Sequence, residues 1–195
     1  MVVATLNEVF SEDQVTLRRW RAADIDLVYD AVTSAHEHLL PWMAWAAGFD
    51  RDRAAWFVEQ CEREWATGEA YQFAITTDQV VCGSAGLMRR IGPGGLELGY
   101  WLHPAYTGRG LATMAAVALI REAFTLPDVD RVEIIHDAAN TASGAVAERL
   151  GFVEVGRRIV EPDAPAKTGV DVVWRLVRDP LPEPPEPLVV TVLPQ

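Results

Sequence analysis

The stretch Leu96-Glu-Leu-Gly-Tyr-Trp-Leu102 runs through His103-Pro-Ala-Tyr106 into Thr107-Gly-Arg-Gly-Leu-Ala112, and this succession is the most informative part of the sequence. Its first seven residues have the aliphatic and aromatic content of a strand. From Ala112 to Ala123 apolar residues recur at helical spacing. The glycines between the two segments indicate a tight strand-to-helix connection. A mixed α/β domain is therefore predicted around this junction.

The glycine-containing loop of this junction is a candidate anion site. Gly108 and Gly110 let backbone N–H groups approach a ligand, because no Cβ stands in the way. The N-terminus of the following helix adds a positive partial charge, and Arg109 adds a full charge. A tight turn without a ligand is the alternative. Thr113 occupies the third glycine position of a dinucleotide loop and no Gly-Lys-Ser/Thr follows, so neither a dinucleotide nor an ATP site is expected.

Alternating strand and helix patterns extend on both sides of the junction. The segments 71–76, 80–89 and 96–102 are separated by short turns, which are typical of antiparallel neighbours. Asp50 and Gly68 are the expected N-cap and C-terminal stop of one helix. Further strands are expected at 15–20, 131–136, 152–160 and 170–177, and further helices near 25–32 and 141–150. We therefore expect one domain over residues 1–177.

The last segment, 178–195, has a different composition, with six of the chain's 12 prolines. Residues 179–187 are expected to be extended and linker-like. Residues 188–193 are apolar, uncharged and strand-prone, so this segment would be prone to aggregation if it were left free. We expect them to dock, either on the chain's own sheet or on a second subunit.

Composition and charge exclude several classes of protein. The 195 residues carry 17 basic and 28 acidic side chains, a net charge of −11. This disfavours nucleic-acid binding, which depends on cationic side chains, and suits a cationic substrate such as an amine. No apolar run is long enough to span a membrane. Two cysteines, and histidines without neighbouring ligands, predict neither disulfides nor a metal site, so a cytoplasmic location is expected.

Two motifs resemble those of one enzyme superfamily. The segment 107–112 resembles the acyl-CoA-binding pattern Gln/Arg-x-x-Gly-x-Gly/Ala of the GNAT (general N-acetyltransferase) superfamily, with Thr107 at the first position. Asn140-Thr-Ala-Ser143 followed by Glu148-Arg-Leu-Gly-Phe152 resembles the branch that acetylates the N-terminal alanine or serine of ribosomal proteins. The resemblance covers about residues 15–177. It implies a mostly antiparallel mixed sheet, flanked by helices and splayed around an acyl-CoA cleft.

The resemblance also implies an activity. Relatives move an acetyl group from acetyl-CoA to a primary amine by direct transfer, without a metal, and many form homodimers. A protein or peptide α-amine is the preferred acceptor, and its lower pKa makes it easier to deprotonate than a lysine. The alternatives are a small-molecule amine such as an antibiotic, a different donor such as succinyl-CoA, or a non-catalytic acyl-CoA-binding protein.

Several residues acquire expected roles from this resemblance. Glu97 is the expected base for the amine, with a surface carboxylate as the alternative reading and His103 as the competing base. Ser143 is expected to protonate the CoA thiolate, since Ala147 replaces the tyrosine that many other members use; helix capping is the simpler reading for Ser143 and Asn140. The residues expected to bind the donor are Leu102, Thr107, Gly108, Arg109, Gly110, Ala112, Thr113 and Asn140.

The acceptor side is expected to involve an aromatic segment near the N-terminus. In relatives, residues equivalent to His38, Trp42 and Trp45 line the acceptor, although tryptophans at this spacing also occur in cores. The only lysine, Lys167, lies in the segment 163–169, which is expected to be an exposed loop. Lysine-based covalent chemistry could therefore use this residue alone.

Overall fold

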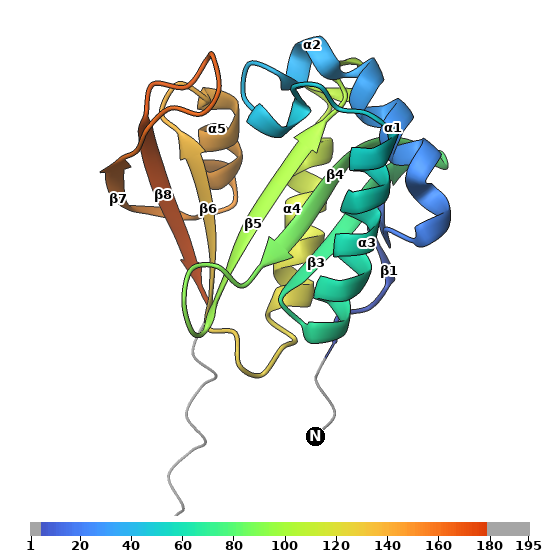
Figure 1. The fold of residues 1–195 in the computed structure, drawn as a ribbon. Helices are drawn as coiled ribbons and strands as arrows, with labels where there is room; N and C mark the ends of the chain where they lie inside the picture. The colour runs from blue at the N-terminus through green and yellow to red at the C-terminus, as the bar shows by residue number, and fades with distance from the viewer. Residues whose placement is uncertain (1–4, 179–195) are drawn as a thin grey trace, which may run out of the picture.

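The computed structural model describes residues 5–178 and contains one eight-stranded sheet (Figure 1). The strands are β1 (Val9–Glu12), β2 (Val15–Arg19), β3 (Ala70–Thr77), β4 (Val80–Met88), β5 (Gly95–Leu102), β6 (Arg131–Asp137), β7 (Val153–Ile159) and β8 (Val170–Val177). They lie in the order β1-β2-β3-β4-β5-β6-β8-β7. Every neighbouring pair is antiparallel except β5 and β6, which are parallel.

Helices cover both faces of this sheet. The α-helices are α1 (Ile25–Ser34), α2 (His36–Leu39), α3 (Arg51–Thr67), α4 (Leu111–Ala123) and α5 (Thr141–Arg149), and the short 3-10 turns are η1 (Ala22–Asp24), η2 (Ala44–Ala46) and η3 (Pro104–Tyr106). In Figure 1, α1 and α3 lie on one face and α4 lies on the other. The fold is therefore layered, with the central strands enclosed between helices.

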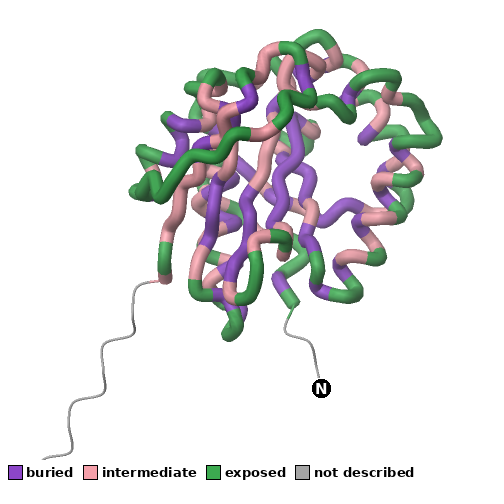
Figure 2. The backbone as a smooth tube through the Cα atoms, turned by 60° about the vertical axis from the view of Figure 1, so that its left-hand side comes forward, coloured by how far each residue is buried: buried purple, intermediate pink, exposed green. Residues whose placement is uncertain are grey.

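The core follows from this layering. Figure 2 shows that buried backbone is concentrated in the central strands, while the outer turns are exposed. One cluster packs α4 against the sheet through residues such as Leu98, Leu111 and Leu119, and a second packs α1 and α3 around Trp20. Within residues 5–178 no helix is both long and apolar enough to cross a membrane.

The helix boundaries agree with the sequence signals. The Asp50 side chain accepts a hydrogen bond from the backbone N–H of Arg53, and Gly68 ends α3 in the left-handed conformation at φ +75°. The predicted mostly antiparallel mixed sheet is confirmed. β1 was not predicted, because four residues with a half-exposed pattern carry little periodic signal. The predictions for 179–195, including the strand-prone 188–193, lie outside the described residues.

Candidate functional site

The site begins where strands β5 and β6 separate. They pair at only three positions: Gly95 with Arg131, Leu96 with Val132, and Glu97 with Glu133. Beyond Glu97 the two strands diverge (Figure 1), and a cleft of about 1290 Å³ lies beside them, lined by residues of both. The splayed sheet that the resemblance implied is therefore present, and Glu97 marks its apex.

The loop at the C-terminal end of β5 forms an open helix N-terminus. Gly108 and Gly110 have φ values of +72° and +78°, a conformation that residues with a Cβ adopt only under strain. Gly110 is the N-cap of α4, and the first turn has neither a side-chain cap nor an acidic residue. A Cβ added at Gly108 would enter open space. The first N–H groups of α4 are thus available to an anion.

Two guanidinium groups lie near this helix terminus. Arg109 stacks on the ring of Tyr106, 5.5 Å from its centroid. Arg149, at the end of α5, donates to the Thr113 hydroxyl across 3.2 Å. The sequence analysis missed Arg149, because only the fold brings the end of α5 to the first turn of α4. The hydroxyl of Thr107 donates to the Pro104 carbonyl at 2.9 Å and so stabilises the loop itself.

Glu97 lines the cleft but is already partnered. It is only 8% exposed, and both its carboxylate oxygens accept hydrogen bonds from Arg90, one of them from Nε at 2.8 Å. These hydrogen bonds raise the pKa of Arg90 above its ordinary value. The Arg90 side chain is 61% exposed and can move into solvent. An incoming amine must therefore compete with Arg90 for Glu97.

The competing base, His103, is engaged elsewhere. Its Nδ1 accepts a hydrogen bond from the Ala105 N–H at 3.2 Å and caps η3. His103 is not among the residues that line the cleft. The geometry therefore favours Glu97 over His103 as the group nearest to a substrate in the cleft.

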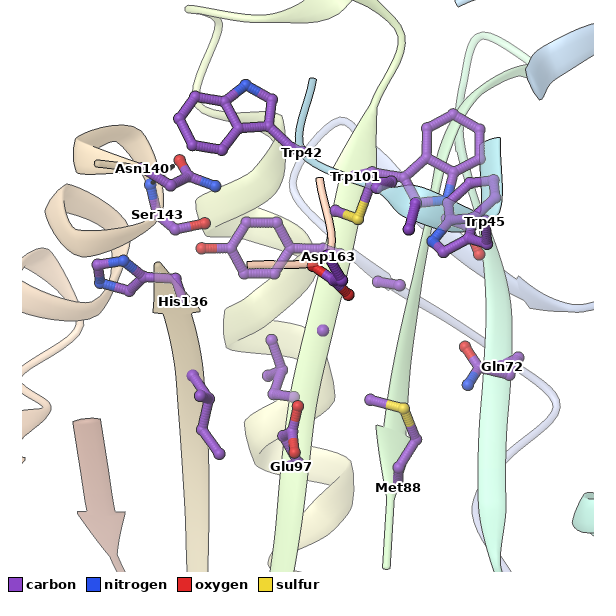
Figure 3. Close-up of a pocket in the computed structure, with 18 of the residues that line it drawn as sticks. Trp42, Trp45, Gln72, Met88, Glu97, Trp101, His136, Asn140, Ser143 and Asp163 are labelled. Carbon is purple, nitrogen blue, oxygen red and sulfur yellow. Dashed lines mark hydrogen bonds between the residues drawn. The ribbon is translucent and has the colours of Figure 1, made fainter. Parts of the chain in front are cut away.

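Helix α5 carries Asn140 and Ser143 to the opposite side of the cleft (Figure 3). The Asn140 side chain accepts from the Ser143 N–H at 3.2 Å, so Asn140 is an N-cap. Tyr100 of β5 also lines the cleft, and its hydroxyl is buried without a hydrogen-bond partner among the described residues. Burial raises the pKa of Tyr100, while the Ser143 side chain opposes this rise. The two hydroxyls are thus close enough to interact, but they lack good hydrogen-bond geometry.

His136 supports this end of the cleft without being a free base. The Trp174 indole N–H donates to its Nε2 at 2.9 Å, and its Nδ1 lies 2.8 Å from the carbonyl oxygen of Asp137. Because an indole can only donate and a carbonyl can only accept, the ring is neutral with its proton on Nδ1. A Cβ on Gly144 would lie 3.2 Å from Nε2, so α5 packs closely on this ring. His136 therefore helps to position Ser143. The sequence analysis missed this role, because it depends on contacts between residues that are distant in the sequence.

Tryptophans line the outer part of the cleft. Trp42 and Trp45 are among them, and the ring centroids of Trp45 and Trp101 lie 6.2 Å apart. Figure 3 shows Trp42 between Asn140 and the Trp45–Trp101 pair. His38 is exposed on α2 and lies outside the cleft, beside a separate hollow that includes Pro104. The structure therefore brings the two tryptophans together with Ser143, but not His38.

The loop between β7 and β8 borders the cleft beside the segment that carries Trp42. Its Ala166 N–H donates to the Pro41 carbonyl at 2.8 Å, which joins it to the segment after α2. Lys167 is only 27% exposed and pairs with Asp163 at 2.6 Å. Both residues line the cleft. The expectation of an exposed loop was therefore only partly right, because residues around Ala164 and Lys167 pack against the cleft.

Asp137 anchors the base of this loop. It is 4% exposed, and its carboxylate accepts from the N–H groups of Ala139, Thr168 and Gly169 and from the Thr168 hydroxyl, at 2.8–2.9 Å. Burial by itself raises the pKa of Asp137, but these hydrogen bonds outweigh it and lower the pKa to about 2. One carboxylate thus fixes both the loop and the start of α5.

The expected site residues divide into three groups. Glu97, Asn140, Ser143, Trp42 and Trp45 line one cleft. Thr107, Gly108, Arg109, Gly110, Ala112 and Thr113 form the loop after β5 and the open start of α4, and Leu102 is buried in the core. Within residues 5–178 no group of three histidine, cysteine, aspartate or glutamate side chains could hold a metal ion. The arrangement offers an anion site, a carboxylate, two hydroxyls and an aromatic wall.

The splayed α/β sheet and the open helix N-terminus after β5 are the arrangement that the resemblance to acyl-CoA-dependent acetyltransferases implied. The model of the acetyltransferase (GNAT) domain matches residues 14–153. The chain therefore belongs to the GNAT acetyltransferase family, and it is an acyl-CoA-dependent N-acyltransferase.

Relatives agree with this assignment. The chain is 26% identical over 150 residues to a protein described as "Putative ribosomal N-acetyltransferase YdaF" of Bacillus subtilis (strain 168), covering 74% of this chain and 81% of that protein. The structure resembles RimL, a ribosomal L7/L12 α-N-protein acetyltransferase in complex with coenzyme A, with a TM-score of 0.81, 19% identity and coverage of 88% and 99%. It also resembles the microcin C7 self-immunity acetyltransferase MccE in complex with acetyl-CoA and AMP, with a TM-score of 0.78, 21% identity and coverage of 85% and 93%.

Proposed function

We propose that the protein transfers an acetyl group from acetyl-CoA to a primary amine, and that its preferred acceptor is the N-terminal α-amine of a protein or peptide. The observation that carries this proposal is the cleft beside the divergence of β5 and β6, because Glu97, Ser143 and the tryptophans line it together, and β5 leads directly into the open start of α4. The bound coenzyme of RimL and the names of the ribosomal relatives support the donor and the acceptor class.

The residues of the cleft suggest how such a transfer proceeds. Phosphate oxygens of the donor bind the first N–H groups of α4, with Arg109 and Arg149 as counter-charges. The acceptor ammonium displaces Arg90 from Glu97 and loses a proton to that carboxylate. The free amine attacks the thioester carbonyl, a C–N bond forms, and the C–S bond breaks. The Ser143 hydroxyl donates a proton to the departing thiolate and regains one from the acylated nitrogen, which becomes a neutral amide. Tyr100 lies close enough to support Ser143.

The proposal is tested by incubating the full chain with acetyl-CoA and short peptides that begin with alanine or serine. Release of free CoA thiol and a mass gain of one acetyl group on the α-amine are the expected results. Matching peptides with a blocked N-terminus and a free lysine side chain serve as the control. Acetylation of the lysine alone would contradict the α-amine assignment.

A small-molecule amine is the second candidate acceptor. Trp45 and Trp101 form an apolar surface of two rings tilted by 52° to each other, which suits a ring as well as a peptide side chain. The MccE structure, which the fold of this chain resembles, contains AMP, a small molecule with a flat ring. This resemblance supports the second candidate. A panel of small amines in the same thiol-release assay separates the two acceptors, because only the preferred class should reach saturation at low concentration.

A cytoplasmic location and a homodimer belong to the same proposal. Both cysteines are buried and free, which suits a reducing compartment. The edge strand β7 exposes Val153, Val155 and Ile159, and exposed apolar side chains at a sheet edge favour contact with a second chain. Sedimentation velocity at several protein concentrations tests the dimer.

A further inference from the structure

The charges that line the cleft cancel one another. Four carboxylates line it, and three form ion pairs: Glu97 with Arg90, Asp171 with Arg158 at 3.0 Å, and Asp163 with Lys167 at 2.6 Å. The fourth, Asp137, accepts four hydrogen bonds from backbone and hydroxyl groups. Each lining carboxylate is thus occupied within the described part of the chain. Although the chain has a net charge of −11, no carboxylate that lines the cleft is therefore left without a partner among the described residues.

This pairing bears on which amines can bind. The amine that reacts can displace one cation, Arg90, because that side chain is mostly exposed. A second or third ammonium group on the same acceptor would have to break further pairs. Holding an ammonium without a free carboxylate also costs its solvation. The cleft therefore suits an acceptor with a single positive charge.

Five tryptophans line the cleft, and one of them, Trp20, is fully buried. The other four, which we call the tryptophan wall, are Trp42, Trp45, Trp56 and Trp101. Trp45 is 41% exposed and Trp56 is 61% exposed, so large apolar surfaces face solvent in the absence of a ligand. Exposed apolar surface that is continuous with a polar reactive centre is typical of a ligand-binding surface.

The tryptophan wall is held in place by contacts from distant segments. Arg53 of α3 donates to the carbonyls of Ala47 at 2.6 Å and of Trp45 at 3.3 Å. The Ala166 N–H of the β7–β8 loop binds the carbonyl of Pro41, next to Trp42. A binding surface that is fixed before the ligand arrives loses little conformational entropy on binding. The wall can therefore discriminate between acceptors by shape.

Building on the proposed acetyl transfer, we propose that the acceptor presents one amine next to a flat apolar group, and that Trp45 and Trp101 receive this group. In a peptide, the flat group is an aromatic side chain at the second position, directly after the reacting residue. In a small molecule, it is an aromatic ring close to a lone amine. Polycationic amines are poor substrates. A peptide and a small molecule would present the same two groups, an amine and a flat apolar group, and the assay distinguishes between them.

The test compares four acceptors in the thiol-release assay with the full chain. They are a peptide beginning with serine then tryptophan, the same peptide beginning with serine then alanine, tryptamine as an aromatic monoamine, and spermidine as a polycation. We expect kcat/KM for the serine–tryptophan peptide to exceed that for the serine–alanine peptide about three- to tenfold, the range that one aromatic contact provides. Spermidine should be the slowest of the four. If tryptamine is faster than both peptides, the flat group belongs to a small molecule and the inference holds.

Two variants link the preference to the wall. Trp45→Ala should bring the ratio between the two peptides close to one. Leu27→Ala removes another exposed apolar side chain, 45% exposed on α1 and outside the cleft, and should leave the ratio unchanged. Equal rates for the two peptides in the unaltered protein, or spermidine as the best acceptor, would overturn the inference and leave acetyl transfer standing. No acetylation of any acceptor, while acetyl-CoA still binds, would overturn the proposed function as well.

Discussion

The two halves of the cleft are built in different ways. The donor half, which consists of β5, the glycine loop and α4, is one continuous segment from Gly95 to Ala123. The acceptor half combines the segment after α2, the start of α3 and the β7–β8 loop, which meet through contacts such as Ala166 with Pro41. A continuous segment leaves a readable pattern in the sequence, whereas a surface assembled from distant parts does not. The proposed donor half thus depends on a local pattern, and the proposed acceptor half depends on how distant segments fold together.

The largest effect is expected at the apex where the halves meet. If Glu97 is the base, Glu97→Gln should lower kcat/KM by roughly 10²–10⁴ with CoA binding retained, and higher pH should recover part of the loss because more free amine is present. Steady-state kinetics between neutral and alkaline pH measure this. Glu133→Gln is the matched control, since Glu133 faces Glu97 in the register, is also buried and is held by Arg175, yet does not line the cleft.

The outcome at Glu97 distinguishes three bases. Full activity of Glu97→Gln together with loss of activity in His103→Ala would assign the base to His103. If neither variant matters, solvent removes the proton, and the enzyme works by holding its two substrates together.

The donor half alone should respond to Gly110→Val. A valine at φ +78° is strained, and its branched side chain would cover N–H groups at the start of α4. Loss of one or more hydrogen bonds to a charged group should weaken CoA binding roughly ten- to a hundredfold, measured by calorimetry. Gly151→Val imposes the same backbone strain at φ +79° outside the glycine loop and should leave CoA affinity unchanged. Unchanged affinity in a folded Gly110→Val protein would refute the donor site.

Ser143 should matter for the leaving group rather than for the amine. Ser143→Ala removes a hydrogen bond to a developing charge, so kcat should fall roughly 10–100-fold, with little recovery at high pH. Tyr100→Phe should have a smaller effect in the same direction, because its hydroxyl acts next to Ser143. Thr141→Ala, in the same first turn of α5, is the control. If Ser143→Ala is as active as the unaltered protein, Ser143 takes no part in the reaction and is only a residue of helix α5.

The smallest effect is expected from loosening the acceptor half. The folded-state pKa of Asp137, about 2, is below the ordinary value of 3.8, so its contribution to stability is present above about pH 4 and is lost as the pH falls towards 2. Asp137→Asn should lower the free energy of unfolding at pH 7 by about 1–3 kcal/mol and weaken this acid dependence. Urea unfolding at several pH values measures both. Asp163→Asn, in the same loop but exposed, should change less.

Much of the fold and part of the site could be predicted from sequence. The strands from Ala70 to Leu102, the caps Asp50 and Gly68, and the glycine loop all depend on local pattern, and the structure agrees with them. Arg90 on Glu97, Arg149 near Thr113, and Trp174 on His136 depend on which distant segments become neighbours. No periodicity encodes such pairs. His38, which a motif placed on the acceptor side, is exposed on α2 and lines a separate hollow, a placement that the motif alone does not encode.

The three-residue pairing of β5 with β6 has a consequence for the empty protein. Past Glu97 the facing rims of both strands present backbone N–H and C=O groups that no strand satisfies, so the sheet has two internal edges in addition to its outer ones. In the proposed function these internal edges stay open for the donor. A donor with amide groups, bound in this gap as proposed, would pair with the strands as an extra strand does. Such a donor would also protect the enzyme from unwanted strand pairing.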